Sequence, residues 1–270
     1  MIDPGTGLTI LGSAIGGAKV VEKILGPTSE YIGEQLKEWT EKKINNLSNI
    51  FQNAEIKLGE KINLEGKVPP KVLKGILEDG AWCEEEFQIE YFGGVLASSR
   101  SGISRDDRGG YFVSLISRLS TYQLRMHYFV YHLVKNAFDG QEMNIGDSID
   151  RTKMEIFIPF TIYYQAMDFS PDEMNLFYSL LNHSIWGLNK EDLIARFLFG
   201  PVDYIRDRFK NAQAPGIILQ PTSLGVELFM WAYGHGQKPN SDFFIKELQF
   251  NNDHNIKIGN PILTQEKNNR

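Results

Sequence analysis

Residues 84–99, EEEFQIEYFGGVLASS, close the stretch from Lys19 to Ser99 around which the rest of the chain is organised. Three glutamates open this run, where a helix N-terminus favours negative charge. Phe87, Tyr91 and Val95 follow at helical spacing, and the small residues after Tyr91 allow another element to pack closely. Consecutive helical residues point in different directions, so the glutamates predict a helix start rather than a metal or acid–base site.

A long amphipathic helix is predicted before this run. Pro27 ends the preceding segment, and Thr28 or Ser29 can cap the helix by accepting a hydrogen bond from a free backbone N–H. Apolar residues then recur mostly at steps of three or four, at Ile32, Leu36, Trp39, Ile44, Leu47, Ile50, Phe51, Ala54 and Leu58. This period predicts a helix of about 30 residues, roughly 45 Å long, with several later helices packed against it.

Two further helices are predicted from turn and cap residues. Pro69-Pro70 leads the chain into a short helix that ends near Gly80, because proline suits the first turn of a helix. Ser120 can cap a second helix that runs from about Thr121 to Phe138. Both helices belong to the same predicted helical domain.

Two groups of ionisable residues in this domain do not form the patterns of known sites. The loop Ser101–Gly110 holds Arg105-Asp106-Asp107-Arg108, which predicts a local ion-pair cluster rather than a catalytic pair of carboxylates. His127 and His132 lie five residues apart, so they do not share a helix face as two metal ligands four residues apart would.

The motifs of this half of the chain resemble those of the bacterial abortive-infection alpha (Abi-alpha) family. The resemblance rests on Lys23–Gly33, Asn49-Ile50, Val68–Leu73 and Gly94–Ser99, and it covers roughly residues 17–137. It implies a mainly helical fold and a role in defence against phage, often through arrest or death of the infected cell. The family has no established catalytic residues that would transfer to this chain.

The first 26 residues are rich in glycine. Gly12 and Gly16, with Gly17 beside them, form a small-xxx-small pattern that lets another backbone approach a helix closely. One interpretation is a segment that inserts into a membrane or forms an oligomer contact. The other is a helix packed on the domain or a loosely ordered arm, since each glycine costs about 1 kcal/mol in a helix. The weakly polar run Leu8–Val21 is shorter than the roughly 20 apolar residues of an ordinary transmembrane helix.

The second half of the chain begins with a connection, Asp139–Asp150, that is the predicted domain boundary. Met154, Ile156 and Ile158 alternate with Glu155 and Phe157, which makes a short strand possible, although Pro159 could equally begin a helix. Ser170-Pro171-Asp172-Glu173 is a capping box with proline at the first helical position, and it predicts a helix to Leu181.

A winged-helix-like α+β region is predicted from the order of the elements that follow. A second helix is expected over Asn189–Phe199 and a third, shorter one after Pro201. The apolar residues 217–219 predict a strand, and a closing helix should end near Tyr233, before Gly234.

Winged helices commonly bind DNA, which requires basic side chains against the phosphates. Arg206, Arg208 and Lys210 form the local basic cluster of this region and are the candidate nucleic-acid contacts. Between Pro171 and Gly234, however, five Lys or Arg stand against seven Asp or Glu, a net charge of −2. This balance favours a protein-interaction or structural role over nucleic-acid binding.

Composition sets further bounds on the protein. Its 270 residues are 42% hydrophobic and 23% charged, as in folded globular proteins. A net charge of −6 gives no whole-protein field that would attract nucleic acid or anionic lipid. The single cysteine, Cys83, excludes an internal disulfide and a cysteine-rich zinc site. The N-terminus lacks a secretory pattern, so a cytoplasmic protein is expected.

The sequence therefore predicts a mostly α fold in four parts. These are a glycine-rich segment at 1–26, a helical domain at 27–138, the winged-helix-like region at 139–250 and a polar tail at 251–270. The predicted function is antiphage defence of abortive-infection type, through binding to a protein partner or phage component and, conditionally, to a membrane. The alternative is a nucleic-acid-associated regulator. An oligomer is compatible with either function, and no motif predicts an enzyme, a cofactor or a metal site.

Overall fold

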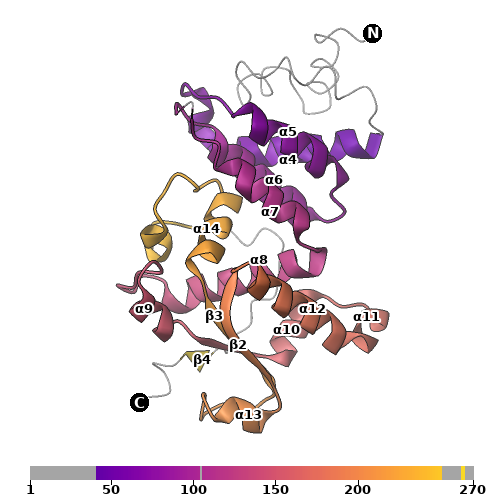
Figure 1. The fold of residues 1–270 in the computed structure, drawn as a ribbon, viewed down its shortest axis with the longest axis vertical. Helices are drawn as coiled ribbons and strands as arrows, with labels where there is room; N and C mark the ends of the chain where they lie inside the picture. The colour runs from indigo at the N-terminus through magenta and orange to yellow at the C-terminus, as the bar shows by residue number, and fades with distance from the viewer. Residues whose placement is uncertain (1–40, 104, 251–262, 265–270) are drawn as a thin grey trace. The chain divides into compact units, whose positions relative to one another are not determined.

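The computed structural model describes residues 41–103, 105–250 and 263–264 (Figure 1). The contacts between residues divide the chain into two compact units. Unit 1 comprises Met1–Thr121 and Met230–Gln237, and unit 2 comprises Tyr122–Phe229 and Lys238–Arg270. The division follows Thr121, at the start of a helix, whereas the sequence predicts a boundary after that helix ends at residue 138.

Unit 1 is helical, as the sequence predicts. Its described elements are α4 (Glu41–Leu58), the 3-10 helix η3 (Gly59–Asn63), α5 (Pro70–Asp79), the 3-10 helix η4 (Gly80–Trp82), α6 (Glu86–Ser99) and α7 (Gly109–Arg118). Pro70 lies in the first turn of α5, and Glu86 lies in the first turn of α6. Both predicted helix starts are therefore confirmed, whereas α7 was not anticipated.

The predicted long helix is confirmed where the structure describes it. Leu47, Ile50 and Ala54 of α4 are fully buried, as their spacing requires. The predicted cap at Thr28 and the apolar residues up to Trp39 lie outside the described residues.

Glycines let α6 approach its neighbours on two sides. A Cβ atom added to Gly93 would lie 2.6 Å from the Cβ of Asn53 on α4. A Cβ atom added to Gly94 would overlap the carbonyl group of Ala232. The close packing predicted for these small residues is therefore confirmed, and at Gly94 the neighbour is backbone that cannot rotate away.

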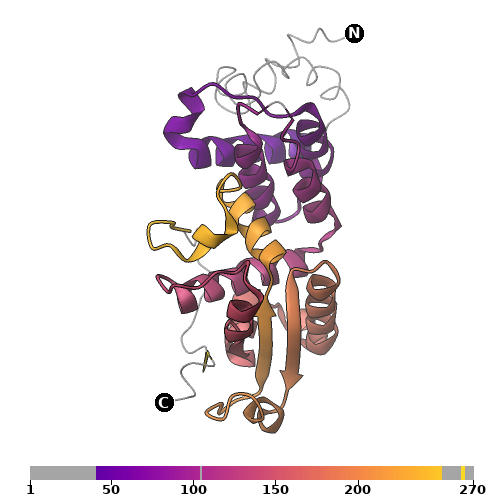
Figure 2. The ribbon, with the colours of Figure 1, turned by 60° about the vertical axis from the view of Figure 1, so that its left-hand side comes forward.

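Unit 2 combines helices with one antiparallel sheet (Figure 2). Its helices are α8 (Thr121–Phe138), α9 (Ser148–Lys153), α10 (Phe160–Met167), α11 (Pro171–Asn175), α12 (Phe177–Lys190), α13 (Val202–Arg206), α14 (Ser223–Ala232) and the 3-10 helix η5 (Asn240–Phe244). Its strands are β1 (Ile156–Pro159), β2 (Ile194–Gly200), β3 (Gly216–Pro221) and β4 (Leu263–Thr264). The last three residues of α14 belong to unit 1. The expected mostly α fold with a small α+β region is therefore confirmed.

The strands lie in the order β2-β3-β1-β4. Phe157 on β1, Ile218 on β3 and Leu198 on β2 stand side by side in register. This row packs against Ile205 and Phe209, which form a hydrophobic cluster with it on one face of the sheet. Alternation along each strand sends the neighbouring side chains to the other face.

The helix predicted over Asn189–Phe199 is wrong. The helix α12 continues to Lys190, Asp192 turns the chain with a φ of 56°, and β2 begins at Ile194. The Asn189 side-chain amide donates to the carbonyl oxygen of Ile194 at 3.0 Å. Pairing with β3 overrides the helical reading of this apolar run, because short apolar runs fit either structure. Consequently these residues do not form a recognition helix.

The other predictions for unit 2 are mostly confirmed. The capping box at Ser170 is present, but its helix stops at Asn175 and α12 begins at Phe177. The predicted strand and the alternative helix around Pro159 are both present, because β1 ends at Pro159 and α10 begins at the next residue. After α14, Gly234 has a φ of +76°, which supports the predicted stop.

A buried histidine on α8 is held by backbone. The His127 ring is fully buried, and its Nε2 donates to the Gly225 carbonyl oxygen at 3.0 Å. Beside it, the Tyr131 hydroxyl donates to the Leu193 carbonyl oxygen at 2.5 Å. Burial lowers the pKa of His127 to about 3, against which the hydrogen bond to Gly225 acts. The histidine is therefore neutral in the folded protein near pH 7.

We expect Gly94→Ala to destabilise the protein by about 1–3 kcal/mol or more, because the new methyl group overlaps backbone. Gly102→Ala is the matched control, since a Cβ atom at Gly102 would have nothing within 4 Å. Urea unfolding followed by circular dichroism measures both free energies. Equal stability of the two variants would contradict the close approach at Gly94.

Protonation of His127 should weaken the fold in acid. The unfolded histidine binds a proton below pH 6.5, whereas the folded one stays neutral down to about pH 3. The unfolded state therefore holds more protons between these values, and stability falls with decreasing pH by up to about 1.4 kcal/mol per unit. Urea unfolding of wild type and His127→Gln between pH 7 and 4 should show a smaller slope for the variant. His183→Gln, which replaces a histidine at an exposed position, is the matched control.

Candidate functional site

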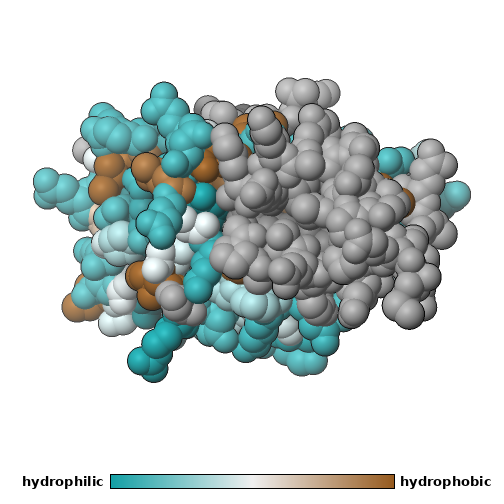
Figure 3. Space-filling view, turned by 90° about the horizontal axis from the view of Figure 1, so that it is seen from above, coloured by the Kyte–Doolittle hydropathy of each residue, from teal (hydrophilic) through white to brown (hydrophobic). Residues whose placement is uncertain are grey.

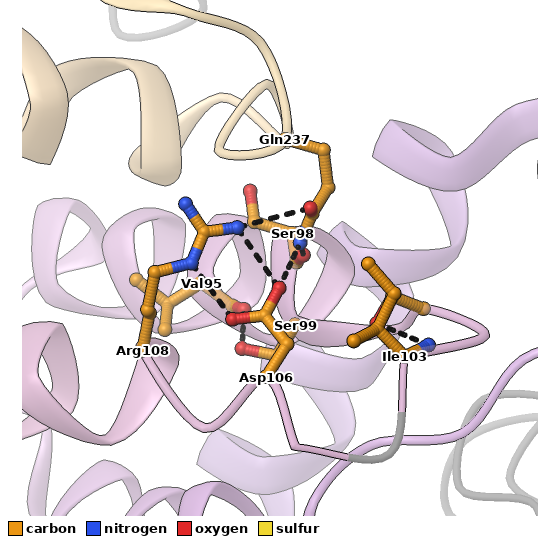
Figure 4. A network of polar contacts seen from close by, with 8 residues as sticks. Val95, Ser98, Ser99, Ile103, Asp106, Arg108 and Gln237 are labelled. Atoms are coloured by element: carbon orange, nitrogen blue, oxygen red, sulfur yellow. Dashed lines mark hydrogen bonds and ion pairs between the residues drawn. The ribbon is translucent and has the colours of Figure 1, made fainter.

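A network of polar side chains lies in unit 1 where α6 ends (Figure 4). Gln237 contacts both Ser98, from α6, and Asp106, from the loop that follows, and Asp106 pairs with Arg108 of the same loop. We refer to these four residues as the Asp106 cluster. The cluster joins segments that are more than 120 residues apart in the sequence.

Arg108 and Asp106 form a two-pronged ion pair. The Arg108 Nε donates to Asp106 Oδ1 at 2.7 Å, and Nη2 donates to Asp106 Oδ2 at 2.9 Å. The local ion-pair cluster predicted from Arg105-Asp106-Asp107-Arg108 is thereby confirmed for these two residues. A bidentate pair fixes the plane of the guanidinium as well as its position.

Gln237 ties the ion pair to α6. Its Nε2 donates to the Ser98 carbonyl oxygen at 2.8 Å and to Asp106 Oδ2 at 3.0 Å. Its Oε1 accepts a hydrogen bond from Arg108 Nη2 at 3.1 Å. The Ser98 hydroxyl donates to the Trp231 carbonyl oxygen and accepts from the Gly236 N–H, each at 3.0 Å.

The two charges of the ion pair, Asp106 and Arg108, differ in how far they are buried. The Asp106 side chain is 7% exposed, whereas the Arg108 side chain is 53% exposed. The Arg108 guanidinium also lies over the Trp231 ring, 5.5 Å from its centroid. The hydrogen bond from Arg108 is the main cause that lowers the pKa of Asp106 to about 2, although burial acts in the opposite direction.

This arrangement suits binding better than proton transfer. A carboxylate with a pKa of about 2 stays ionised near pH 7 and is a weak base. The Ser98 hydroxyl accepts from one backbone N–H and donates its proton to a backbone carbonyl oxygen rather than to a base. Instead the buried carboxylate holds a guanidinium in a fixed, half-exposed position against an aromatic ring.

A second charge pair in unit 1 is buried. Lys57 Nζ on α4 donates to Glu90 Oε1 on α6, and the two side chains are 9% and 5% exposed. The same ammonium lies 4.9 Å from the centroid of the Tyr233 ring. Because both side chains are buried, each charge needs the other as its partner, and neither is accessible to a ligand.

The predicted nucleic-acid contacts lie in unit 2, at and after α13. Arg206, Arg208 and Lys210 are exposed. Arg206 Nε donates to the Ala212 carbonyl oxygen at 2.9 Å, and Arg208 pairs with the buried Glu155 at 3.0 Å. Both arginines therefore have partners within the chain, and their contact with nucleic acid stays a prediction.

The predicted membrane or oligomer contacts, Gly12, Gly16 and Gly17, lie outside the described residues. None of the described helices is both long and apolar enough to cross a membrane. In the view of Figure 3, the described apolar side chains form small patches between hydrophilic ones. Scattered exposure of this kind is ordinary for a protein surface.

The glutamates and histidines that the sequence analysis considered as metal ligands do not gather at one site in the described residues. Glu84, Glu85 and Glu86 are exposed at the start of α6, and Glu84 pairs with Lys42 at 2.8 Å. Within the described ranges, His, Cys, Asp and Glu side chains form no group of three or more that could hold a metal ion.

Comparison with known proteins adds no relative: no family model, no curated protein and no solved structure matches the sequence. The resemblance to the abortive-infection alpha family therefore stays a prediction that rests on the quoted motifs.

Several residues of these networks were not identified from the sequence. Ser98 and Gln237 gave no signal, because each is an ordinary polar residue until folding brings them together. Glu90 did carry one, since it is a charged residue directly before the uncharged, apolar and small residues 91–99 of the predicted helix. A buried carboxylate requires a partner, and Lys57 is that partner.

Removing one member of the buried pair should be costly. Glu90→Ala leaves the Lys57 ammonium buried without its carboxylate, and we expect a loss of about 3–5 kcal/mol in the free energy of unfolding. Glu84→Ala, in the exposed pair with Lys42, should change stability little. The double variant Lys57→Met with Glu90→Leu should regain most of the loss, because neither charge then remains. A Glu90→Ala protein as stable as Glu84→Ala in urea unfolding would contradict the buried pair.

Proposed function

We propose that this protein is a bacterial antiphage defence protein of abortive-infection type that acts by binding. The observation that carries the proposal is that two motifs of the family resemblance pack on one residue. A Cβ atom at Gly109 would lie 3.2 Å from Val72 Cγ1, of the motif Val68–Leu73. It would also overlap Ser99 Oγ, of the motif Gly94–Ser99. The resemblance thus falls on residues that build one packed centre beside the Asp106 cluster.

The Asp106 cluster is the proposed contact surface. Arg108 offers a fixed guanidinium that can bind a carboxylate on a protein partner or phage component, or stack on an aromatic side chain. Its orientation is set before binding, which lowers the entropy cost of recognition. In this proposal the protein binds its partner in the cytoplasm. The glycine-rich segment at residues 1–26 is the candidate for membrane contact once the protein is activated.

A phage challenge tests the function and the surface together. A bacterial host expressing wild type should reduce plaquing of at least one phage in a panel tenfold or more against empty vector. At high phage dose the culture should arrest or die, as abortive infection requires. Arg108→Ala should lose most of this protection, because the guanidinium is removed from the surface.

Arg105→Ala is the matched control, since it removes an equally charged, exposed side chain of the same loop. Protection should persist in this variant, and circular dichroism should show that both variants fold. Deleting residues 1–18 tests the membrane version separately, through membrane potential during infection. If Arg105→Ala and Arg108→Ala protect equally, the cluster is not the contact surface. If wild type protects against no phage, the proposed function fails.

A nucleic-acid-associated regulator remains the alternative function. It predicts salt-dependent DNA or RNA binding that weakens in Arg206→Ala with Arg208→Ala. The ion pair between Arg208 and Glu155 weighs against this surface, because phosphate would have to displace a buried carboxylate.

A further inference from the structure

The strand β2 forms an edge of the sheet in unit 2. In the order β2-β3-β1-β4, one side of β2 pairs with β3. No strand of the described residues pairs with its other side, as the ribbon shows (Figure 2). An open edge offers unpaired backbone N–H and C=O groups to another strand.

The hydrogen-bond pattern shows which residues face that open side. The Phe160 N–H donates to the Pro215 carbonyl oxygen at 3.0 Å, in line with the β1–β3 ladder. Hydrogen-bonded pairs recur every second residue in an antiparallel ladder, so Ile158 and Ile217 form the next one. The residues of β3 that turn their backbone groups toward β1 are therefore Ile217 and Leu219.

The intervening residues of β3 face β2. Gly216 and Ile218 thus pair with Gly200 and Leu198, which are their partners in register. Alternation along β2 then leaves the N–H and C=O groups of Phe197 and Phe199 pointing to the open side.

The side chains at this edge are aromatic and partly exposed. The Phe197 and Phe199 rings are parallel, with centroids 6.5 Å apart. Trp186 on α12 packs edge-on against Phe197 at 4.8 Å, and the tryptophan is itself 59% exposed. Leu198 points to the opposite face, where it packs against the cluster that contains Phe157 and Phe209.

We propose that a second copy of this chain docks on this edge, with the two β2 strands antiparallel about a two-fold axis at Leu198. This register makes Phe197 of each copy a hydrogen-bonded pair with Phe199 of the other. It uses all four of the outward backbone groups of each strand, in four hydrogen bonds. The two Leu198 residues form the central pair without backbone hydrogen bonds.

Charge is compatible with this self-pairing. Arg196 is the only charged residue of β2, and in this register it stands opposite Gly200 of the other copy. The two arginines are four residues apart along the paired strands, about 14 Å at 3.4 Å per residue. That distance exceeds the roughly 8 Å over which charges act at physiological salt, so the copies do not repel one another here.

Neighbouring registers fit less well. A shift of the axis to Phe199 places Phe197 opposite Pro201, which has no N–H to donate. A shift to Phe197 places Phe199 opposite Ala195, next to the irregular register between Ile194 and Phe197. The carbonyl oxygen of Ala195 already accepts a hydrogen bond from Asn189. The regular part of β2 is therefore short, and a weak, concentration-dependent dimer is expected.

Sedimentation velocity of the full chain tests the association. The mass should rise with concentration from the 30.7 kDa of one chain toward twice that value. Phe199→Pro removes the Phe199 ring and, from the backbone, one outward N–H, so it should raise the dissociation constant at least tenfold. The fold should tolerate this change, because proline is accepted where the N–H faces away from the sheet. Tyr178→Ala, at an exposed aromatic residue of α12 whose ring packs against Phe160 and Phe177, should leave the constant unchanged.

Cysteine cross-linking tests the register. The central pair without hydrogen bonds brings two Cα atoms to about 4.5 Å, within the range of a disulfide. Leu198→Cys should therefore give a disulfide-linked dimer under mild oxidation, whereas Arg196→Cys should remain largely monomeric. Cys83 does not compete, since it is buried and burial raises the pKa of its thiol to about 12.

Either of two results would overturn the proposal. One is a wild-type chain that sediments as a monomer at every concentration, with Leu198→Cys failing to cross-link. The other is equal cross-linking of Leu198→Cys and Arg196→Cys, which indicates random collision. Thermal melts of each variant by circular dichroism confirm that the comparison is between folded proteins.

Discussion

The close approach of α6 to the backbone at Ala232 is the constraint on which unit 1 depends. Gly94 has no room for a Cβ atom there, and Gly93 is nearly as restricted against α4. A helix confined on two sides has little access to solvent, which is why positions 90–99 of α6 are all buried. Every polar group on that helix must then find a partner within the protein. Ser98 finds backbone, and Glu90 finds the ammonium of Lys57.

Much of this packing could be predicted from the sequence, because it is encoded locally. Helical spacing, the proline at the start of α5 and the glutamates before α6 each act over a few residues. The small residues Gly93 and Gly94 indicated close contact but not its partner. Ala232 is 138 residues further along the chain, and no local pattern at either position connects the two.

The failure over Asn189–Phe199 has a related cause. Its apolar residues fit a helix as well as a strand, and the choice is made by β3, whose backbone groups need partners. At the candidate site too, the local contact could be predicted from the sequence and the distant one could not. The ion pair of Asp106 and Arg108 lies within three residues and was anticipated, whereas Gln237 joins it from 131 residues away.

The two charge pairs of unit 1 differ in what they permit. Lys57 and Glu90 are both buried, so loss of either partner would leave the other charge buried without compensation. The Arg108 side chain is half-exposed, and only its partner, the Asp106 carboxylate, is buried. Because Asp106 keeps its charge down to about pH 2, it already neutralises the guanidinium near pH 7. A ligand at Arg108 would therefore gain little from net charge, and recognition there would depend on the fixed plane of the guanidinium and the Trp231 ring beneath it. The proposed contact surface would therefore select a partner by geometry more than it would attract one by charge.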